Sequence, residues 1–481
     1  MNNVSLIEYI NGRKCTVLGL GVSNLPLAKA ITDAHLPLTV YDKAEVGMLG
    51  KDAEKLMENG ARFVVSNSFQ DVEGELIFRS PGIRPDRITT VSERAEITSE
   101  MELFLRLTPA KTFAVTGSDG KTTSTTLTGL FLSEEGKRTG NSSTFVGGNI
   151  GTPLLTKCCE MSKTDNAVLE LSSFQLMGIK NTPDFAAITN VSPNHLDWHV
   201  DMDEYVSAKK NIIGENTRRL VTNADCEQTL LIAREYAVRE DIEIILFSSR
   251  KHSFEEIFDG FPKHEKARAF FTDGGYICVA DKNGKTPLLA TEKIKVPGRH
   301  NVENFMTAMA LTYGEVDASV YESVAESFCG VEHRLELVRE LDGVAYYNSS
   351  IDSSPTRTAA ALGAMAERSI VLIAGGYDKK IPYAPLASAV VEHGGVHTVS
   401  LTGATGMRIC EEIEKYRAET GKGKNITVKY NADFDDAVRF ARESAGQGDV
   451  VLLSPASASF DAFKNFAERG ATFKKLVKEF K

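Results

Sequence analysis

Short apolar runs typical of β-strands alternate with helical patterns along the whole of this 481-residue chain. Strands separated by helices usually pair in parallel, with the helices covering the sheet. The alternation therefore predicts the α/β fold class with parallel sheets. At roughly 150 residues per domain, the length allows about three domains.

The predicted domains are residues 1–97, 98–330 and 331–481. The turn-rich stretch from about 243 to 295 predicts hairpins, and a helix is expected over 301–313. We expect the first and third domains to be open, Rossmann-like α/β sheets and the central one to be a P-loop ATPase-type α/β domain. Strand candidates are 15–19, 38–42, 75–80, 112–117, 166–170, 185–190, 219–223, 344–349, 369–375, 397–402, 425–430 and 449–453.

Composition and charge restrict the partners and the compartment. The chain has 55 basic and 65 acidic residues, a net charge of −10 and no long basic run, so neither nucleic acid nor an anionic membrane is expected as a partner. No stretch approaches the ~18 apolar residues of a membrane span, and the first ten residues lack the pattern of a secretory signal. Seven cysteines without a CxxC pair predict reduced thiols. We therefore expect a cytoplasmic protein, and a monomer.

The segment Thr116-Gly-Ser-Asp-Gly-Lys-Thr-Thr123 lies between an apolar strand candidate and a helical segment, the context of a phosphate-binding P-loop. Its two glycines allow backbone N–H groups to turn toward an anion. Lys121 would reach the outer phosphates, and Thr122 offers a hydroxyl to Mg²⁺. Val115 stands where the usual pattern has its first glycine, so the prediction depends on the strand–helix context. A glycine-rich connection with an incidental lysine is the structural alternative.

A second glycine turn, Gly19-Leu-Gly-Val-Ser-Asn24, follows the first strand candidate, and Asp42 closes the second. It resembles a dinucleotide-binding turn, in which glycines approach a pyrophosphate and the acidic residue holds ribose hydroxyls. Asn24 replaces the third glycine and loosens the packing that a nicotinamide site requires. Two phosphate sites favour a nucleotide-tagged substrate together with ATP. A nicotinamide dehydrogenase and a purely structural turn are the alternatives.

Glu170 ends one apolar strand candidate and His195 follows another, at the edge of a parallel sheet where ligands bind. A carboxylate at 170 can hold Mg²⁺ opposite the Thr122 hydroxyl, or it simply caps its strand. The cluster His195-Leu-Asp-Trp-His199 raises zinc chelation as an alternative, but no further Cys or His lies at ligand spacing.

Lys209 shares a predicted helix face with Tyr205, Ala208 and Ile212, whereas Lys210 lies about 100° round the helix. Such a lysine commonly extends its ammonium group past the apolar residues to water. Burial, however, lowers a lysine pKa below its usual ~10.4, and the neutral amine can take up CO₂ as a carbamate. A carbamate at position 209 would be an anionic metal ligand.

Taken together, these residues resemble the Mur ligase superfamily, most closely its D-glutamate-adding members, over essentially the whole chain. The DNPR signature of the diaminopimelate-type branch is absent. The motifs that carry the resemblance are Thr116-Gly-Ser-Asp-Gly-Lys-Thr-Thr123, Val146-Gly-Gly-Asn-Ile-Gly151, Leu169-Glu-Leu-Ser-Ser-Phe-Gln175, Asn190-Val-Ser-Pro-Asn-His-Leu-Asp197, Pro297-Gly-Arg-His-Asn-Val-Glu-Asn304, His333-Arg-Leu-Glu336 and Leu453-Ser-Pro-Ala-Ser-Ala-Ser-Phe-Asp-Ala-Phe-Lys-Asn-Phe466.

The resemblance implies an ATP-dependent amide ligase that adds D-glutamate to UDP-N-acetylmuramoyl-L-alanine through an acyl phosphate, in peptidoglycan precursor synthesis. It implies ATP, two Mg²⁺ ions and a carbamylated Lys209. The first domain would bind the UDP part, the central domain ATP and Mg²⁺, and the last would close over the site with D-glutamate. Another Mur-type ligase, a folylpolyglutamate synthase-like enzyme and a non-catalytic regulator with a decayed site are the alternatives.

The resemblance also implies the role of each matching residue. Catalysis is assigned to Lys121, Glu170, His195 and Lys209, and metal binding to Thr122, Glu170, His195 and Lys209. ATP binding is assigned to Gly117, Ser118, Asp119, Gly120, Lys121, Thr122, Thr123, Asn301, Asn304 and Arg334. The UDP substrate is assigned to Gly19, Leu20, Gly21, Val22, Ser23, Asn24, Asp42, Ser80, Pro81, Gly82, Asn149 and Ser172. D-Glutamate is assigned to Lys379, Ser459 and Phe466.

One stretch departs from the family pattern. Where the family usually reads N-D-S-K-A-T-N, this chain has Asn348-Ser-Ser-Ile-Asp-Ser-Ser354. Ser349 therefore replaces an aspartate expected near the nucleotide, and Ile351 replaces a lysine. Asp352 offers a carboxylate from a different position. A smaller departure is Asp119 in the phosphate loop, where asparagine is frequent.

Overall fold

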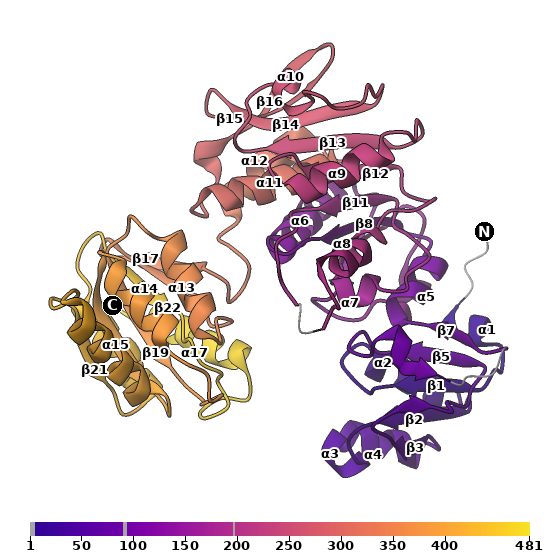
Figure 1. Ribbon diagram of the computed structural model, residues 1–481, viewed down its shortest axis with the longest axis horizontal. Coiled ribbons are helices and arrows are strands. Elements are labelled where there is room, and N and C mark those ends of the chain that lie inside the picture. The colour runs from indigo at the N-terminus through magenta and orange to yellow at the C-terminus, as the bar shows by residue number, and fades with distance from the viewer. Residues whose placement is uncertain (1–4, 90–93, 196–197) are drawn as a thin grey trace. The chain divides into compact units, whose positions relative to one another are not determined.

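The computed structural model describes residues 5–89, 94–195 and 198–481. They form two compact units, one of Met1–Lys293 with Arg299–Glu326 and one of Ile294–Gly298 with Ser327–Lys481. Two large α/β sheets lie in the first unit and one in the second, which confirms the predicted fold class (Figure 1). The domain boundaries at 97/98 and 330/331 stay predictions, because the first two sheets share one unit.

The first sheet has five parallel strands in the order β3-β2-β1-β5-β7. The short strands β3 and β7 at its two edges were not predicted. Its strands are β1 (Cys15–Leu18), β2 (Leu38–Asp42), β3 (Arg62–Val65), β5 (Leu76–Arg79) and β7 (Glu96–Thr98), with a separate pair β4 (Phe69–Gln70) and β6 (Ile88–Thr89). The helices are α1 (Leu6–Ile10), α2 (Asn24–Asp33), α3 (Val46–Leu49), α4 (Lys51–Glu58) and the 3₁₀ turn η1 (Pro85–Arg87).

The second sheet has nine strands in the order β16-β15-β14-β13-β12-β11-β8-β10-β9. It is parallel from β9 to β14, and β14, β15 and β16 form antiparallel hairpins, which confirms the prediction from the turn-rich sequence. The strands are β8 (Lys111–Thr116), β9 (Thr144–Gly148), β10 (Asn166–Glu170), β11 (Phe185–Ile188), β12 (Arg219–Asn223), β13 (Glu243–Ser248), β14 (Ala267–Asp273), β15 (Tyr276–Asp281) and β16 (Gly284–Ala290).

Apolar strands and helix faces build the core of this sheet. Phe113 of β8 stacks on Phe185 of β11, with ring centroids 4.7 Å apart, and the Phe131 ring packs edge-on against Phe305 and Tyr321. Large buried rings such as these contribute much of the apolar area that a core removes from water. The helices are α5 (Glu100–Leu107), α6 (Lys121–Thr139), η2 (Leu155–Glu160), α7 (Ser173–Leu176), α8 (Met202–Lys210), α9 (Glu227–Tyr236), α10 (Phe254–Ile257), η3 (Thr291–Lys293), α11 (Arg299–Thr312) and α12 (Ala318–Ser327).

The sheet of the second unit has six strands in the order β17-β18-β22-β19-β20-β21, parallel except for the β17–β18 pair. All five predicted strands are present, whereas β17 was not predicted because its charged, half-buried sequence has little apolar alternation. The elements are β17 (Glu336–Leu341), β18 (Val344–Asn348), α13 (Pro355–Ala364), β19 (Ile370–Gly375), α14 (Ala384–Glu392), β20 (Val396–Thr402), α15 (Gly406–Thr420), β21 (Thr427–Tyr430), α16 (Phe434–Ser444), β22 (Val450–Leu453) and α17 (Phe466–Glu479).

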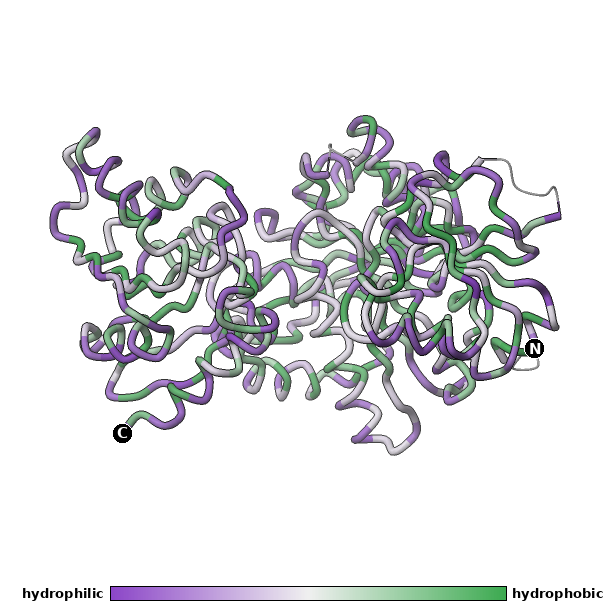
Figure 2. Tube along the Cα trace, turned by 90° about the horizontal axis from the view of Figure 1, so that it is seen from below, coloured by the Kyte–Doolittle hydropathy of each residue, from purple (hydrophilic) through white to green (hydrophobic). Residues whose placement is uncertain are grey.

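Hydrophobic stretches of the trace run through the interior of each unit, while hydrophilic stretches gather on outer loops and helix surfaces (Figure 2). Such a distribution follows from the burial of apolar area. Over the described ranges, none of the helices combines the length and the apolar character needed to cross a bilayer.

Candidate functional site

The phosphate loop joins β8 to α6, as the sequence predicted. Gly117 has φ = +147° and Gly120 has φ = +78°, backbone conformations that L side chains rarely adopt. A Cβ at 117 would also overlap the hydroxyl of Thr189, and one at 120 would overlap the amide oxygen of Asn304. Both positions therefore require glycine.

The segment that follows β11 holds the loop in place. The backbone N–H of Ser118 donates to the carbonyl of Asn190 at 2.9 Å, and that of Asp119 donates to Asn190 Oδ1 at 2.9 Å. Ser118 Oγ accepts from the N–H of Ser192 at 2.9 Å and lies 3.0 Å from the hydroxyl of Tyr205. The loop is thus ordered by its own neighbours, which lowers the cost of binding an anion.

Two lysines converge on one carbonyl of this loop. Lys121 Nζ donates to the carbonyls of Gly117 and Ser118, both at 2.9 Å, and Lys209 Nζ donates to the same Gly117 oxygen at 2.7 Å. Lys209 is only 1% exposed. Burial, together with the nearby Lys121 charge, lowers the pKa of Lys209 to about 7.

The predicted helix face of α8 is confirmed. Tyr205 and Ala208 of α8 are buried with Lys209, and so is Ile212, which lies just beyond the end of the helix, whereas Lys210 reaches the surface and forms an ion pair with Glu235. The helical spacing therefore correctly distinguished the buried Lys209 from the surface Lys210. The structure places the buried amine at the phosphate loop.

Glu170 is the last residue of β10 and is 1% exposed. Its Oε1 accepts from Asn149 Nδ2 at 2.7 Å, while its Oε2 is buried and has no hydrogen-bond partner. The strand register pairs Glu170 with Val115, two residues before Gly117. A buried carboxylate oxygen with no donor fits a cation ligand, because an unsatisfied polar atom is otherwise costly. Ser172 lies two residues further on and caps α7 by accepting from the N–H of Gln175 at 3.3 Å.

His195 has a left-handed backbone with φ = +55°, and its ring lies edge-on to Phe174 of α7, with centroids 5.0 Å apart. His195 is therefore near the helix that follows Glu170. The zinc alternative included Asp197, which lies outside the described residues. His199 uses both ring nitrogens on Ser173 and Glu204.

Within residues 5–89, 94–195 and 198–481, the structure shows no group of three or more His, Cys, Asp and Glu side chains arranged to hold a metal. The predicted magnesium set is of a different kind, because it also uses a hydroxyl, from Thr122, and a modified lysine. Thr122 lies in the first turn of α6.

The two turns predicted for the sugar nucleotide lie side by side in the first sheet. Leu20 N–H donates to Asp42 Oδ2 at 2.8 Å, and a Cβ on Gly19 would lie 3.1 Å from Cβ of Ser80. Asn24 is fully buried and donates from Nδ2 to the carbonyl of Gly19 at 2.9 Å. Its amide therefore closes the turn from inside, at the position where the dinucleotide pattern has its third glycine.

The first two turns of α11 lie beside the phosphate loop. Asn304 Oδ1 accepts from Ser124 Oγ at 3.3 Å, and Asn304 Nδ2 donates to Asn301 Oδ1 at 3.3 Å. Thr123, the neighbour of Ser124, is buried. Both asparagines that were predicted for ATP are thus beside the loop.

The predicted D-glutamate residues lie in the second unit. Lys379 Nζ donates to the carbonyl and the hydroxyl of Ser353, both at 3.3 Å, and burial beside Arg357 and Arg469 lowers its pKa. Ser459 is buried, and Phe466 is 40% exposed. The contact of Arg334, also in this unit, with a nucleotide stays a prediction.

The unusual stretch from Asn348 to Ser354 is well ordered by internal contacts. Ser349 Oγ accepts from the N–H of Leu335 at 3.2 Å, so this serine holds the His333–Glu336 turn. Asp352 Oδ2 accepts from Ser454 Oγ at 2.9 Å, and burial raises the pKa of this carboxyl. Arg334 is close enough to lower that pKa in part.

Comparison with known proteins shows which family the chain belongs to. Residues 115–312 match the Mur ligase middle domain, and residues 333–457 match the Mur ligase glutamate ligase domain. A UDP-N-acetylmuramoylalanine–D-glutamate ligase of Ruminiclostridium cellulolyticum is 43% identical over 479 residues, covering 98% of both chains. The ligase of the same name from Clostridium beijerinckii is 42% identical over 480 residues, again 98% of both. The chain belongs to the Mur ligase family.

Solved structures agree on the fold of this Mur ligase. The UDP-N-acetylmuramate–alanine ligase of Thermotoga maritima matches with a TM-score of 0.55 at 18% identity, over 98% of this chain and all of the other. A UDP-N-acetylmuramoyl-L-alanyl-D-glutamate–2,6-diaminopimelate ligase matches with a TM-score of 0.56 at 16% identity, over 92% and 91%. At these identities the likeness supports the fold alone.

Sequence reasoning missed Arg469, which is 2% exposed in the second unit of this Mur ligase. Its guanidinium donates to the carbonyls of Ser350, Ser457 and Ala458 at 2.9 to 3.1 Å, and so ties the unusual stretch to the loop before α17. A signal was present, because Arg469 shares a helix face with Phe473 at i+4. It is the same signal that identified Lys209.

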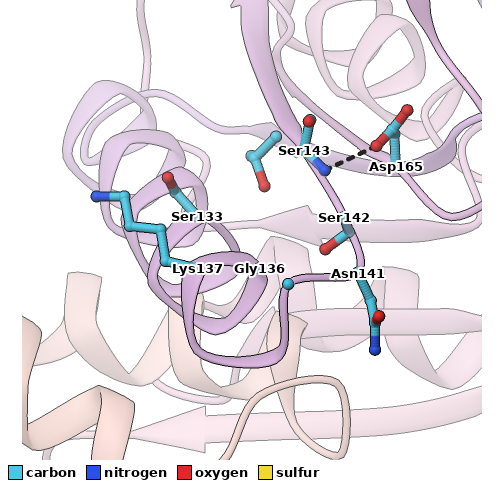
Figure 3. Close-up of a pocket in the computed structure, with 9 residues that line it drawn as sticks. Ser133, Gly136, Lys137, Asn141, Ser142, Ser143 and Asp165 are labelled. Atoms are coloured by element: carbon cyan, nitrogen blue, oxygen red, sulfur yellow. Dashed lines mark hydrogen bonds between the residues drawn. The ribbon is translucent and has the colours of Figure 1, made fainter.

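A surface depression of about 500 Å³ lies at the far end of α6, lined by Ser133, Lys137, Asn141, Ser143 and Asp165 among others (Figure 3). Its first lining residue, Ser133, is 12 residues beyond Lys121 on α6, so the depression begins roughly 18 Å from the phosphate loop. Asp165 already accepts from the N–H groups of Ser143 and Ser162, and Lys137 pairs with Glu134. The charged residues of the depression thus already have partners within the chain, and the depression is not part of the site.

Proposed function

We propose that this chain catalyses the ATP-dependent addition of D-glutamate to UDP-N-acetylmuramoyl-L-alanine, a step of peptidoglycan precursor synthesis. The relatives that match nearly its full length are ligases named for this pair of substrates. The structural observation that carries the proposal is the convergence of Lys121 and Lys209 on the Gly117 carbonyl, next to the strand that ends at Glu170.

The first step joins the substrate carboxylate to the γ-phosphoryl group of ATP. A carboxylate oxygen attacks phosphorus, the bond to the β–γ bridging oxygen breaks, and ADP leaves with an acyl phosphate formed. Two anions must meet, so the protein contributes mainly position and positive charge. Backbone N–H groups of Gly120 and of the first turn of α6, which has no side-chain cap, would cradle the phosphates, and Lys121 turns from the loop carbonyls to their oxygens.

The residues at the loop fit a bound magnesium ion. Glu170 has a buried oxygen without a donor, Thr122 offers a hydroxyl, and His195 and a carbamylated Lys209 complete the proposed ligands. When bound, Mg²⁺ would neutralise negative charge on phosphate oxygens. The Lys209 amine has a pKa near 7, so it is available in the neutral form that reacts with CO₂.

In the second step the neutral amine of D-glutamate attacks the acyl carbon. The C–N bond forms, the C–O bond to phosphate breaks, and the amine loses a proton. Lys379, whose pKa is lowered by burial, Ser459 and Phe466 would hold the amino acid. Exclusion of water matters because acyl phosphates hydrolyse, and this is the role we assign to closure of the second unit.

The direct test is phosphate release from ATP by the purified full chain. We expect release only when UDP-N-acetylmuramoyl-L-alanine and D-glutamate are both present, with the amide product detected by mass spectrometry. Release with a different amino acid or with a folate would favour another ligase of this type. Absence of release with any pair would favour a regulator, and a change in NADH absorbance would favour a dehydrogenase.

We extend the proposal to a monomer in the cytoplasm. All seven cysteines are free in the structure, which suits a reducing compartment. Sedimentation analysis of the full chain tests the assembly, with a mass of 52.5 kDa expected.

A further inference from the structure

Arg84 follows the Ser80–Gly82 turn of the first sheet and contacts α8, one of the helices that accompany the second sheet. Its two terminal nitrogens donate to the two oxygens of Glu204, both at 2.9 Å, and Nη1 also donates to the carbonyl of Trp198 at 2.7 Å. The pair is shielded, with 15% of the Arg84 side chain and 23% of the Glu204 side chain exposed. Two parallel bonds of this kind fix orientation as well as distance.

Glu204 also holds a buried histidine. His199 Nδ1 lies 3.2 Å from Glu204 Oε2, and His199 Nε2 lies 2.9 Å from Ser173 Oγ, at the start of α7. Burial lowers the pKa of His199, and its two ring nitrogens lie within hydrogen-bond distance of the carboxylate and of the serine hydroxyl. The three residue types are those of a hydrolase triad. Ser173 is only 2% exposed, however, which leaves no room for an acyl group, so their role is to fix α7 against α8.

The same helix carries the contacts to the phosphate loop. Tyr205, the residue after Glu204, has its hydroxyl 3.0 Å from Ser118 Oγ, and Lys209 lies about one turn further on and donates to the Gly117 carbonyl. Helix α7 begins three residues after Glu170. The contacts from Arg84 through Glu204 and His199 therefore link α8 and α7, the two helices that border the proposed catalytic residues.

We propose that Arg84, Glu204 and His199 are positioning residues that couple the sugar-nucleotide turn at Ser80–Gly82 to the phosphate loop. The inference rests on the proposed function, since it takes UDP-N-acetylmuramoyl-L-alanine as the ligand of the turn. When that ligand orders the turn, Arg84 holds α8, and with it Tyr205, in the arrangement that the loop needs for a triphosphate. Two sites joined in this way bind their ligands with a mutual coupling free energy.

The test measures that coupling directly by calorimetry on the full chain. The affinity of a non-hydrolysable ATP analogue with Mg²⁺ is determined with and without saturating UDP-N-acetylmuramoyl-L-alanine. For the wild-type chain we expect the sugar nucleotide to raise the affinity for the analogue, so that the ratio of the two affinities is about 5 or more. In Arg84→Ala and Glu204→Gln this ratio falls to near one, and Arg84→Lys, which keeps the charge but not the paired bonds, is intermediate.

Arg87→Ala is the matched control, because Arg87 is exposed on the same segment, three residues on. It keeps the wild-type ratio. Thermal unfolding checks each variant, and Glu204→Gln and Arg84→Lys carry the test if Arg84→Ala does not fold. A wild-type ratio of one, or an unchanged ratio in Glu204→Gln and Arg84→Lys, overturns the coupling while both ligands still bind. A wild-type chain that does not bind the sugar nucleotide overturns the proposed function as well.

Discussion

Replacing Lys209 tests the chemistry proposed for the buried amine. With a pKa of about 7, about nine-tenths of this amine is neutral at pH 8, against about 0.3% for a lysine of pKa 10.5. Burial therefore raises the fraction that can react with CO₂ by roughly 300-fold. The carbamate would place a negative charge beside Lys121, where the unmodified side chain is mostly neutral at this pH.

We expect Lys209→Ala to lose about 100-fold or more of the ligase activity, the range seen when one preorganised charged group is removed from an active site. A small carboxylic acid such as acetate should restore part of it, because the acid can occupy the space left by the carbamate. Lys210→Ala is the control, since its side chain pairs with Glu235 at the surface, and it should keep most activity. Phosphate release with both substrates, with and without acetate, is the assay.

Two results would refute this reasoning. Equal losses at positions 209 and 210 would contradict the argument that only one of these lysines faces the site. A large loss at 209 that no small acid restores, together with the absence of a carbamate signal from ¹³C-bicarbonate in the wild-type NMR spectrum, would contradict the modification.

Three further changes have defined outcomes. Glu170→Gln keeps the Asn149 bond but loses the charge, so the Mg²⁺ concentration for half-maximal binding of an ATP analogue should rise by about tenfold or more, with an unchanged melting temperature. Gly117→Ala places a Cβ against Thr189 at φ = +147° and should abolish analogue binding, whereas Gly47→Ala, which meets nothing within 4 Å, should not. Glu100 is buried, and its pKa is raised from 4.5 to about 7. Ionisation of this carboxyl therefore lowers the free energy of unfolding by about 3 kcal/mol. This loss of stability is absent below pH 4.5 and complete above pH 7. Glu100→Gln should therefore become more stable than the wild-type chain as the pH rises from 5 to 8, as measured by denaturant titration. A difference in the free energy of unfolding between the two chains that does not change with pH would contradict this.

The sequence predicted those parts of the molecule that a local pattern defines. The phosphate loop was visible because a strand, two glycines, a lysine and a helix must follow one another directly. The burial of Lys209 was visible because helical spacing places it with Tyr205 and Ile212. The hairpins after β13 were visible because Asp-Gly-Gly and Asn-Gly favour tight turns.

Contacts between distant segments were not predictable in this way. Arg84 and Glu204 are 120 residues apart, and no periodicity connects them. The unpaired oxygen of Glu170 depends on which donors surround it in three dimensions. Strand β17 was missed because an edge strand can carry charged residues that a central strand cannot.

The shared Gly117 carbonyl has a consequence for which anions the loop accepts. Lys121 donates to two backbone oxygens of the loop. An incoming anion has to compete with these two bonds for the ammonium group, which has three donors in all. A small, singly charged ion gains little binding free energy in this competition, whereas the higher charge of a triphosphate gains the most. The internal hydrogen bonds of the loop therefore disfavour the binding of ordinary cellular salts.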